Sequence, residues 1–129
     1  MYSVKTYTIK NKDFNFIEVS HSNIKVTFMD YGATILSIFT PDKDNRKESI
    51  LMAFDSLEQY IDNDIYLNAI IGPTSGRIKN AEFKINNQSY QLDKNNQKQD
   101  NLHGGSDTFA FKFFDFEIKE EKDQTKVIF

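Results

Sequence analysis

The sequence has no cysteine, and it contains only two histidines, two prolines and five glycines in 129 residues. Without cysteine, disulfides and thiolate metal sites are excluded. No apolar run is long enough for a signal peptide or a membrane span, so we expect a cytoplasmic protein with no membrane partner. The net charge is −3 and the basic residues are scattered, so no stripe exists for a phosphate backbone and nucleic acid is not an expected partner.

What is present indicates one globular domain over residues 1–129, with 39% hydrophobic and 14% aromatic residues. Apolar and polar residues alternate over most of the chain, as in Ile24, Val26 and Phe28. We predict antiparallel strands within residues 14–40, 81–92 and 109–129, and one short helix at 56–61 that Ser56 can cap. The fold class is therefore all-β, an antiparallel β-sandwich.

Two details refine this prediction. Asn86-Asn87 tolerate positive φ and predict the turn of a hairpin within residues 81–92. Residues 126–129 form an apolar strand at which the sequence stops, and a strand at that position needs a neighbour. We therefore expect the sandwich to be incomplete in this chain.

The first candidate binding residue is Arg77, one of two arginines among 16 basic residues. It follows Gly72-Pro73 and Gly76, which allow the backbone to bend sharply and approach a ligand. Its planar guanidinium suits sugar hydroxyls or a carboxylate. The alternative is structural: Arg77 pairs with a carboxylate of this protein at the mouth of a loop.

The second candidate is His103, which is followed by Gly104-Gly105, so that the main chain can turn away and leave the ring edge open. The alternative is a loop histidine bonded to backbone. His21 lies between two serines and is expected to be exposed. Two histidines without other ligands nearby make no metal site, and phosphate-binding and dinucleotide motifs are absent, so we expect no metal and no cofactor.

These segments, taken in order, resemble the galactose mutarotase (aldose 1-epimerase) family. The strongest matches are Gly76-Arg77-Ile78 and Leu102-His103-Gly104-Gly105. The other matching segments are Tyr31-Gly32-Ala33-Thr34-Ile35, Pro41-Asp42, Phe54-Asp55-Ser56 through Tyr60, Phe83, Tyr90-Gln91-Leu92, Asn95, Asn96 and Phe109. Together they cover roughly residues 20–115.

The resemblance implies a large β-sandwich (a supersandwich) that binds a monosaccharide in an open cleft and interconverts its α and β anomers. It implies that Arg77 and His103, with Gly76 beside them, hold sugar oxygens. The family's general acid (a second histidine), its base (a glutamate) and a sugar-binding aspartate lie beyond the histidine-glycine-glycine run, at positions with no match here. The resemblance therefore assigns substrate-binding residues to this chain and no catalytic residue.

The sequence departs from the family pattern at three places. Gly76 stands where the family commonly has asparagine, Thr108 where it usually has glycine, and Phe114 where it usually has tryptophan. Another aldose or a sugar phosphate thus stays open as the substrate. Two other functions also stay open: a carbohydrate-binding module without turnover, and a purely structural β-domain.

Overall fold

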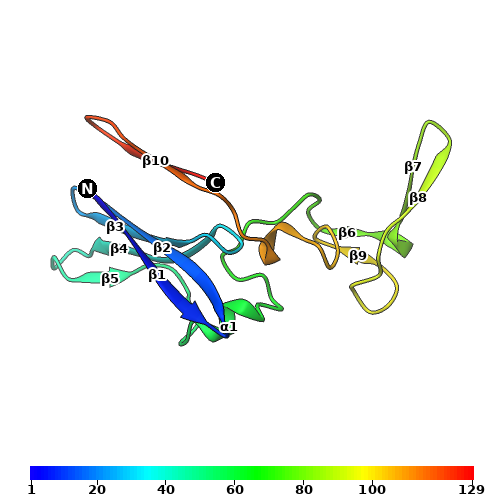
Figure 1. The fold of residues 1–129 in the computed structure, drawn as a ribbon, viewed down its shortest axis with the longest axis horizontal. Coiled ribbons are helices and arrows are strands. Elements are labelled where there is room, and N and C mark those ends of the chain that lie inside the picture. The colour runs from blue at the N-terminus through cyan, green and yellow to red at the C-terminus, as the bar shows by residue number, and fades with distance from the viewer.

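The computed structural model describes all 129 residues, and its centre is a five-stranded antiparallel sheet in the order β1-β2-β3-β4-β5 (Figure 1). The strands are β1 (Tyr2–Ile9), β2 (Lys12–His21), β3 (Ile24–Met29), β4 (Thr34–Pro41) and β5 (Lys47–Ser49). Each strand pairs with the next along the chain, so the sheet is a meander with short turns. The predicted strands within 14–40 are confirmed, and β1 and β5 extend the sheet at both edges.

The largest cluster of core residues lies on one face of this sheet, and Ile17 of β2 is fully buried on the other. Phe14 and Phe16 alternate along β2 and pack with Met29, Tyr31 and Tyr60, and all five side chains are buried. Period-two alternation places Phe14 and Phe16 on the same face, and this is the pattern from which the strand was predicted. The alternating residues of β2 are therefore part of this core, and Tyr60, from the short helix α1 (Glu58–Ile61), completes it.

A buried polar pair lies beside this core. Asp30 is 4% exposed, and its carboxylate accepts hydrogen bonds from the backbone N–H of Asn15 (3.0 Å) and from Asn15 Nδ2 (2.7 Å). A buried carboxylate requires such partners. The pair ties the end of β3 to β2.

The second layer is a hairpin of β10 (Glu117–Glu120) and β11 (Thr125–Ile128), which lies over one face of the sheet (Figure 1). Phe129 contacts Phe28 of β3 across the layers, with ring centroids 6.0 Å apart. A hollow of about 260 Å³, lined mostly by apolar side chains such as Val26 and Val127, remains between them. The all-β antiparallel class is confirmed, with a sandwich whose second layer is two strands wide.

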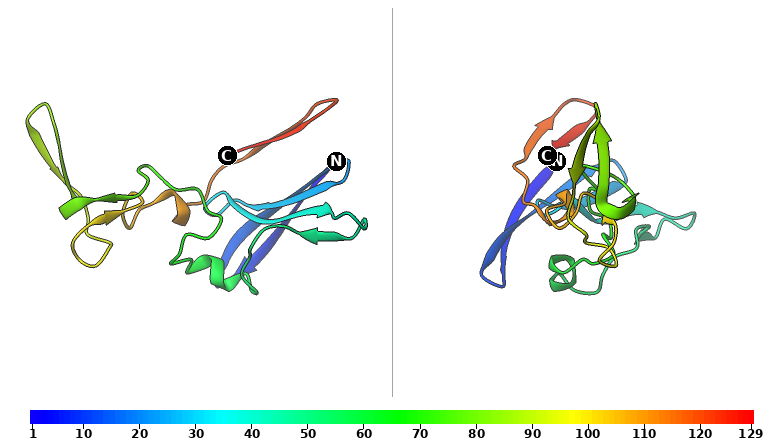
Figure 2. Two further views of the ribbon diagram at one scale, coloured as in Figure 1. Left: turned by 180° about the vertical axis from the view of Figure 1, so that it is seen from behind. Right: turned by 90° about the vertical axis from the view of Figure 1, so that its right-hand side faces the viewer.

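Residues 76–106 form a projecting arm, which extends away from the sheet (Figure 2). It contains β6 (Arg77–Ile78), η1 (Lys79–Ala81), β7 (Glu82–Ile85), β8 (Gln88–Gln91) and β9 (Asn101–Leu102). β7 and β8 form the predicted hairpin, and Asn86 and Asn87 in its turn have φ of 50° and 63°. β6 pairs with β9 although about 25 residues separate them in sequence.

Two predictions need correction. The only α-helix is α1 (Glu58–Ile61); it begins after Leu57, and no side chain caps it. Instead of capping, Ser56 donates its own backbone N–H to Oε1 of Gln59. Residues 109–116 are not strands: they contain the 3₁₀ turn η2 (Phe109–Phe111), because Phe111 and Lys112 donate back to carbonyls three residues earlier.

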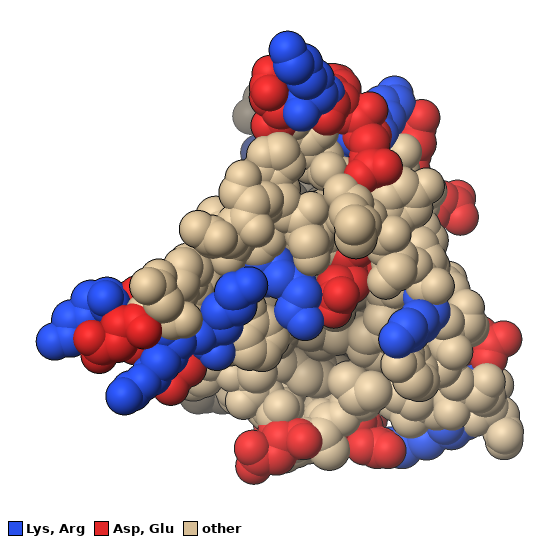
Figure 3. Space-filling model, turned by 90° about the vertical axis from the view of Figure 1, so that its left-hand side faces the viewer, with Lys and Arg blue, Asp and Glu red and all other residues tan.

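Charged side chains lie at the tips and edges of the end of the molecule shown in Figure 3 and also near its middle, and much of the surface between them is uncharged. Lys or Arg and Asp or Glu lie next to one another there, so no broad field of one sign covers this face. No helix in the structure combines the length and the apolar character that crossing a bilayer requires.

Candidate sugar-binding site

Arg77 begins β6, and His103 directly follows β9, the strand that pairs with β6 in the arm. Arg77 is opposite Leu102 in the β6–β9 register, and the backbone N–H of His103 donates to the carbonyl of Gly76 (3.0 Å). A shared sugar site is expected to bring the two residues together at one mouth of the sandwich. Their backbones do lie close together, but in the arm that projects from the sheet (Figure 2) and not at a mouth of the sandwich. That they bind a sugar stays a prediction.

The imidazole of His103 is held in one orientation. Its Nδ1 accepts the backbone N–H of Gly76 at 3.1 Å, and its ring packs edge-on against Tyr66 with centroids 4.9 Å apart. The alternative of a backbone-bonded histidine is thus correct for one nitrogen. Because an acceptor nitrogen carries no proton, the neutral ring has its proton on Nε2. Nε2 has no hydrogen-bond partner in the protein and is not buried, so it presents a donor to a ligand.

The surroundings of the Arg77 guanidinium differ from those expected if Arg77 only formed an ion pair with a carboxylate of this protein. No carboxylate lies within 4.0 Å of it, whereas six other ion pairs are formed in the molecule. Its one hydrogen bond runs from Nε to Oδ1 of Asn96, at 3.2 Å. A guanidinium has five N–H donors, so the four on its two Nη atoms are left for a ligand. The carboxylate-pairing interpretation is therefore wrong.

Gly76 joins the two residues. Both its N–H and its carbonyl are bonded to His103, so its main chain supports the imidazole. Its φ is +76°, in the left-handed region, and a Cβ added there would meet no heavy atom within 4 Å. The open space beside Gly76 is thus next to Arg77 in sequence and next to the backbone that bonds His103.

Three consecutive residues with positive φ shape the loop after β9: His103 (54°), Gly104 (89°) and Gly105 (91°). Gly104 lies against the backbone of Gly72, and a Cβ on Gly104 would be 2.5 Å from the Gly72 oxygen. That oxygen also accepts the hydroxyl of Thr108 at 2.9 Å. The loop is thus packed, backbone on backbone, against the segment that leads to Arg77.

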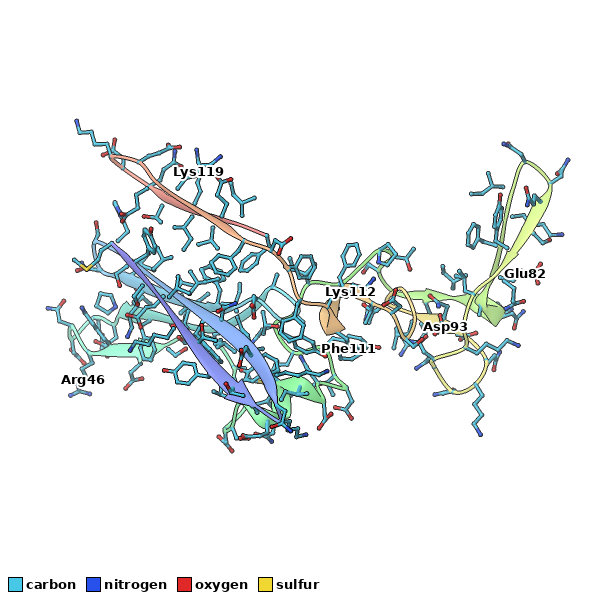
Figure 4. The ribbon with its side chains drawn as sticks, in the orientation of Figure 1. Arg46, Glu82, Asp93, Phe111, Lys112 and Lys119 are labelled. Atoms are coloured by element: carbon cyan, nitrogen blue, oxygen red, sulfur yellow. The ribbon has the colours of Figure 1, made fainter.

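Asp93 closes the loop from the other side, and it lies in the arm close to β9 (Figure 4). Its Oδ2 accepts the backbone N–H of Ser106 (2.7 Å), and its Oδ1 accepts Nδ2 of Asn101 (3.1 Å). The Ser106 N–H is the largest cause of a lowered pKa for this carboxyl; the Ser106 hydroxyl and Asn101 amide add to it, while burial opposes it.

This lowered pKa predicts a change in the loop in acid. A carboxyl whose pKa is lower in the folded state stabilises the fold above its unfolded pKa of about 3.9, and the contribution is lost as pH falls through the folded value. We expect the Ser106 amide and Asn101 side-chain NMR resonances to shift below about pH 4, as the carboxyl protonates. Asp93→Asn is the control and should remove this transition; a transition that survives in Asp93→Asn would assign it to another group.

Sequence reasoning missed several residues that build this site. Neither Asp93 nor Tyr66 has a sequence pattern that marks it as part of a site. Asn95 and Asn96 were recognised only as part of a resemblance, although both side chains bond within the site. The spacing of polar residues before a histidine-glycine-glycine run carries no signal for their partners, because these depend on how the loop folds back.

Comparison with known proteins supports the resemblance. Residues 15–129 match the family model for aldose 1-epimerase. The aldose 1-epimerase of Haemophilus influenzae is 36% identical over 93 residues, covering 71% of this chain and 26% of that protein. The maltose epimerase of Levilactobacillus brevis is 26% identical over 122 residues, covering 94% of this chain and 35% of that protein.

Among solved structures, galactose 1-epimerase from Lactobacillus acidophilus has the same fold, with a TM-score of 0.83 at 23% identity. The match covers 98% of this chain and 37% of that protein. The chain therefore spans between about a quarter and about a third of the length of these relatives.

Proposed function

Because this chain belongs to the aldose 1-epimerase family, we propose that it is the N-terminal portion of an epimerase sandwich and binds an aldose through Arg77 and His103. The reaction interconverts the α and β anomers of the sugar. The substrate class is a reducing sugar, and galactose and maltose are the first candidates because two of the relatives are named for them.

The reaction needs two proton transfers on one ring. A base removes the proton of the C1 hydroxyl while an acid protonates the ring oxygen, and the bond between C1 and the ring oxygen breaks to give the open aldehyde. Rotation about the bond from C1 to C2 presents the other face of the carbonyl. Ring closure then returns both protons and gives the other anomer. The protein's contribution is to hold the ring between an acid and a base.

The observation that carries the proposal is the reciprocal pair of hydrogen bonds between Gly76 and His103, one strand register from Arg77. The Gly76 N–H occupies Nδ1 of the imidazole and leaves Nε2–H for a ligand, and the Nη donors of Arg77 are likewise without partners in the protein. Donors held in this way suit the hydroxyl and ring oxygens of a sugar. We assign neither the acid nor the base to a residue of this chain.

The binding test compares substitution of Arg77 and of His103 with substitution of the other arginine and the other histidine of the chain. We expect His103→Ala to weaken sugar binding about two- to tenfold, the value of one neutral hydrogen bond. We expect Arg77→Ala to weaken it about tenfold to a hundredfold, because its donor is charged. The matched controls are His21→Ala, at the exposed end of β2, and Arg46→Ala, in the exposed turn between β4 and β5; both should leave affinity unchanged. Titration of galactose and maltose, followed by NMR, measures these affinities.

Polarimetry on freshly dissolved α-galactose separates binding from turnover. The chain alone should not exceed the spontaneous rate, since a general acid or base contributes about a hundredfold or more to such a step. Binding without turnover in every longer form of the protein would favour a carbohydrate-binding module. Catalysis by this chain that His103→Ala abolishes would make His103 a catalytic acid or base and contradict our assignment.

A further inference from the structure

Three side chains of one short loop segment bond to Arg77 of β6, to β9, and to the loop that contains His103. We propose that Asp93, Asn95 and Asn96 are positioning residues: Asp93 and Asn95 fix the backbone that carries His103, and Asn96 fixes the guanidinium of Arg77. One segment between β8 and β9 thus sets the distance and angle between the two sugar donors. The inference rests on the proposed function for its sugar, but its geometry can be tested without one.

The side-chain amide of Asn95 bonds the edge of β9 where the backbone of another strand would otherwise pair. Its Oδ1 accepts the backbone N–H of Leu102 at 2.7 Å, and its Nδ2 donates to the carbonyl of the same residue at 2.8 Å. Leu102 is opposite Arg77 in the β6–β9 register, so β9 has β6 on one side and the Asn95 amide on the other. A two-residue strand has few bonds of its own, and this two-point contact fixes the residue immediately before His103.

Asp93 holds both ends of the turn that contains His103. One carboxylate oxygen bonds Asn101, two residues before His103, and the other bonds Ser106, three residues after it. Asn101 is 1% exposed, and its Nδ2 also donates to the Asp93 carbonyl at 3.0 Å. The carboxylate fits because Gly105 has no side chain: a Cβ there would be 2.0 Å from Oδ1 of Asp93.

Asn96 directs Arg77. Its own backbone is fixed by two hydrogen bonds with Asp100, from Asn96 N–H (3.1 Å) and from Asp100 N–H (3.0 Å). From this position its Oδ1 accepts Nε–H of Arg77 at 3.2 Å. Because the guanidinium is planar, fixing Nε restricts the plane in which the two Nη groups lie. The contact is exposed, so its effect is on orientation more than on folding.

The first experiment is a pair of double-mutant cycles on sugar affinity. Asn96→Ala and Asn95→Ala should each weaken galactose binding about three- to tenfold, on the order of one hydrogen bond. If each acts through its partner, Asn96→Ala should have no further effect in an Arg77→Ala background, and Asn95→Ala none in a His103→Ala background. Lys94→Ala, in the same segment and without a hydrogen bond, is the control and should bind normally. If Asn96→Ala weakens binding as much in the Arg77→Ala background as in the wild type, and Asn95→Ala as much in the His103→Ala background as in the wild type, the proposal is overturned.

The second experiment needs no ligand and reports placement directly. In ¹⁵N NMR spectra, Asn96→Ala should shift Arg77 Nε and speed exchange of its proton. Asn95→Ala should shift the Gly76 amide and His103 Nδ1, and Asn95→Asp, which keeps the acceptor for Leu102, should restore part of that shift. Thermal unfolding should change little in these variants. If the wild-type chain binds no sugar, the proposed function fails, while these resonances still decide the positioning; unchanged resonances would overturn it.

Discussion

Replacing Phe14 by alanine should lower the free energy of unfolding by about 3–5 kcal/mol, the usual loss for a large aromatic side chain removed from a core. Phe14 is fully buried, and its ring contacts Tyr31 (centroids 5.6 Å apart) and Phe113 (5.2 Å). These contacts join β2 to the chain that returns from the arm, so the cavity cannot close by a local shift. Urea denaturation followed by circular dichroism measures the loss.

The control is Tyr2→Ala in the neighbouring strand. Tyr2 is 46% exposed, so its removal should cost less than about 1 kcal/mol, as most surface substitutions do. Comparable losses for Tyr2→Ala and Phe14→Ala would show that the sheet is not packed around Phe14.

Replacing Gly104 by alanine should disrupt the sugar-binding loop at a cost of about 2–6 kcal/mol, the sum of backbone strain and steric overlap. Its φ of +89° disfavours any side chain, and the new Cβ would lie 2.5 Å from the Gly72 oxygen, a backbone atom that cannot rotate away. We expect resonances of residues 101–106 to shift or broaden, and sugar affinity to fall at least about thirtyfold.

Gly76→Ala is the matched control for this experiment. Gly76 also has positive φ, at +76°, but nothing lies within 4 Å of its Cβ position. Only the strain of the left-handed conformation remains, about 1–2 kcal/mol. If Gly104→Ala lowers stability and sugar affinity no more than Gly76→Ala does, the close packing of the loop on Gly72 does not maintain the structure of the site.

The sequence by itself determined the class of fold and the main strands. Phe14 and Phe16 in β2 are separated by Asn15 and preceded by Asp13, and Asn86-Asn87 favour the left-handed turn they adopt. These signals are local, because period-two alternation and turn preference depend on residues only a few positions apart. For the same reason Arg77 and His103 could be chosen from their glycine-rich surroundings alone.

Only the tertiary structure decided which further segments are strands. β1 begins with an alternating pattern but buries none of its residues, and β5 is three exposed polar residues with no pattern. Pairing with β2 and with β4 makes each an edge strand of the sheet. Residues 109–116 have strand-like composition yet turn, because Phe109 and Phe114 donate their N–H groups to Gly72 and Asp30, more than 30 residues away.

The partners of the site residues were likewise decided by tertiary structure. Arg77 meets the amide of Asn96 rather than a carboxylate, and Nδ1 of His103 meets Gly76, 27 positions earlier in the chain. Residue types and local spacing can be read from the sequence, so side chains that could bind a ligand can be recognised from it. The pairing of these groups depends on closure of the β6–β9 loop, whose geometry is set by backbone packing and not by any local pattern.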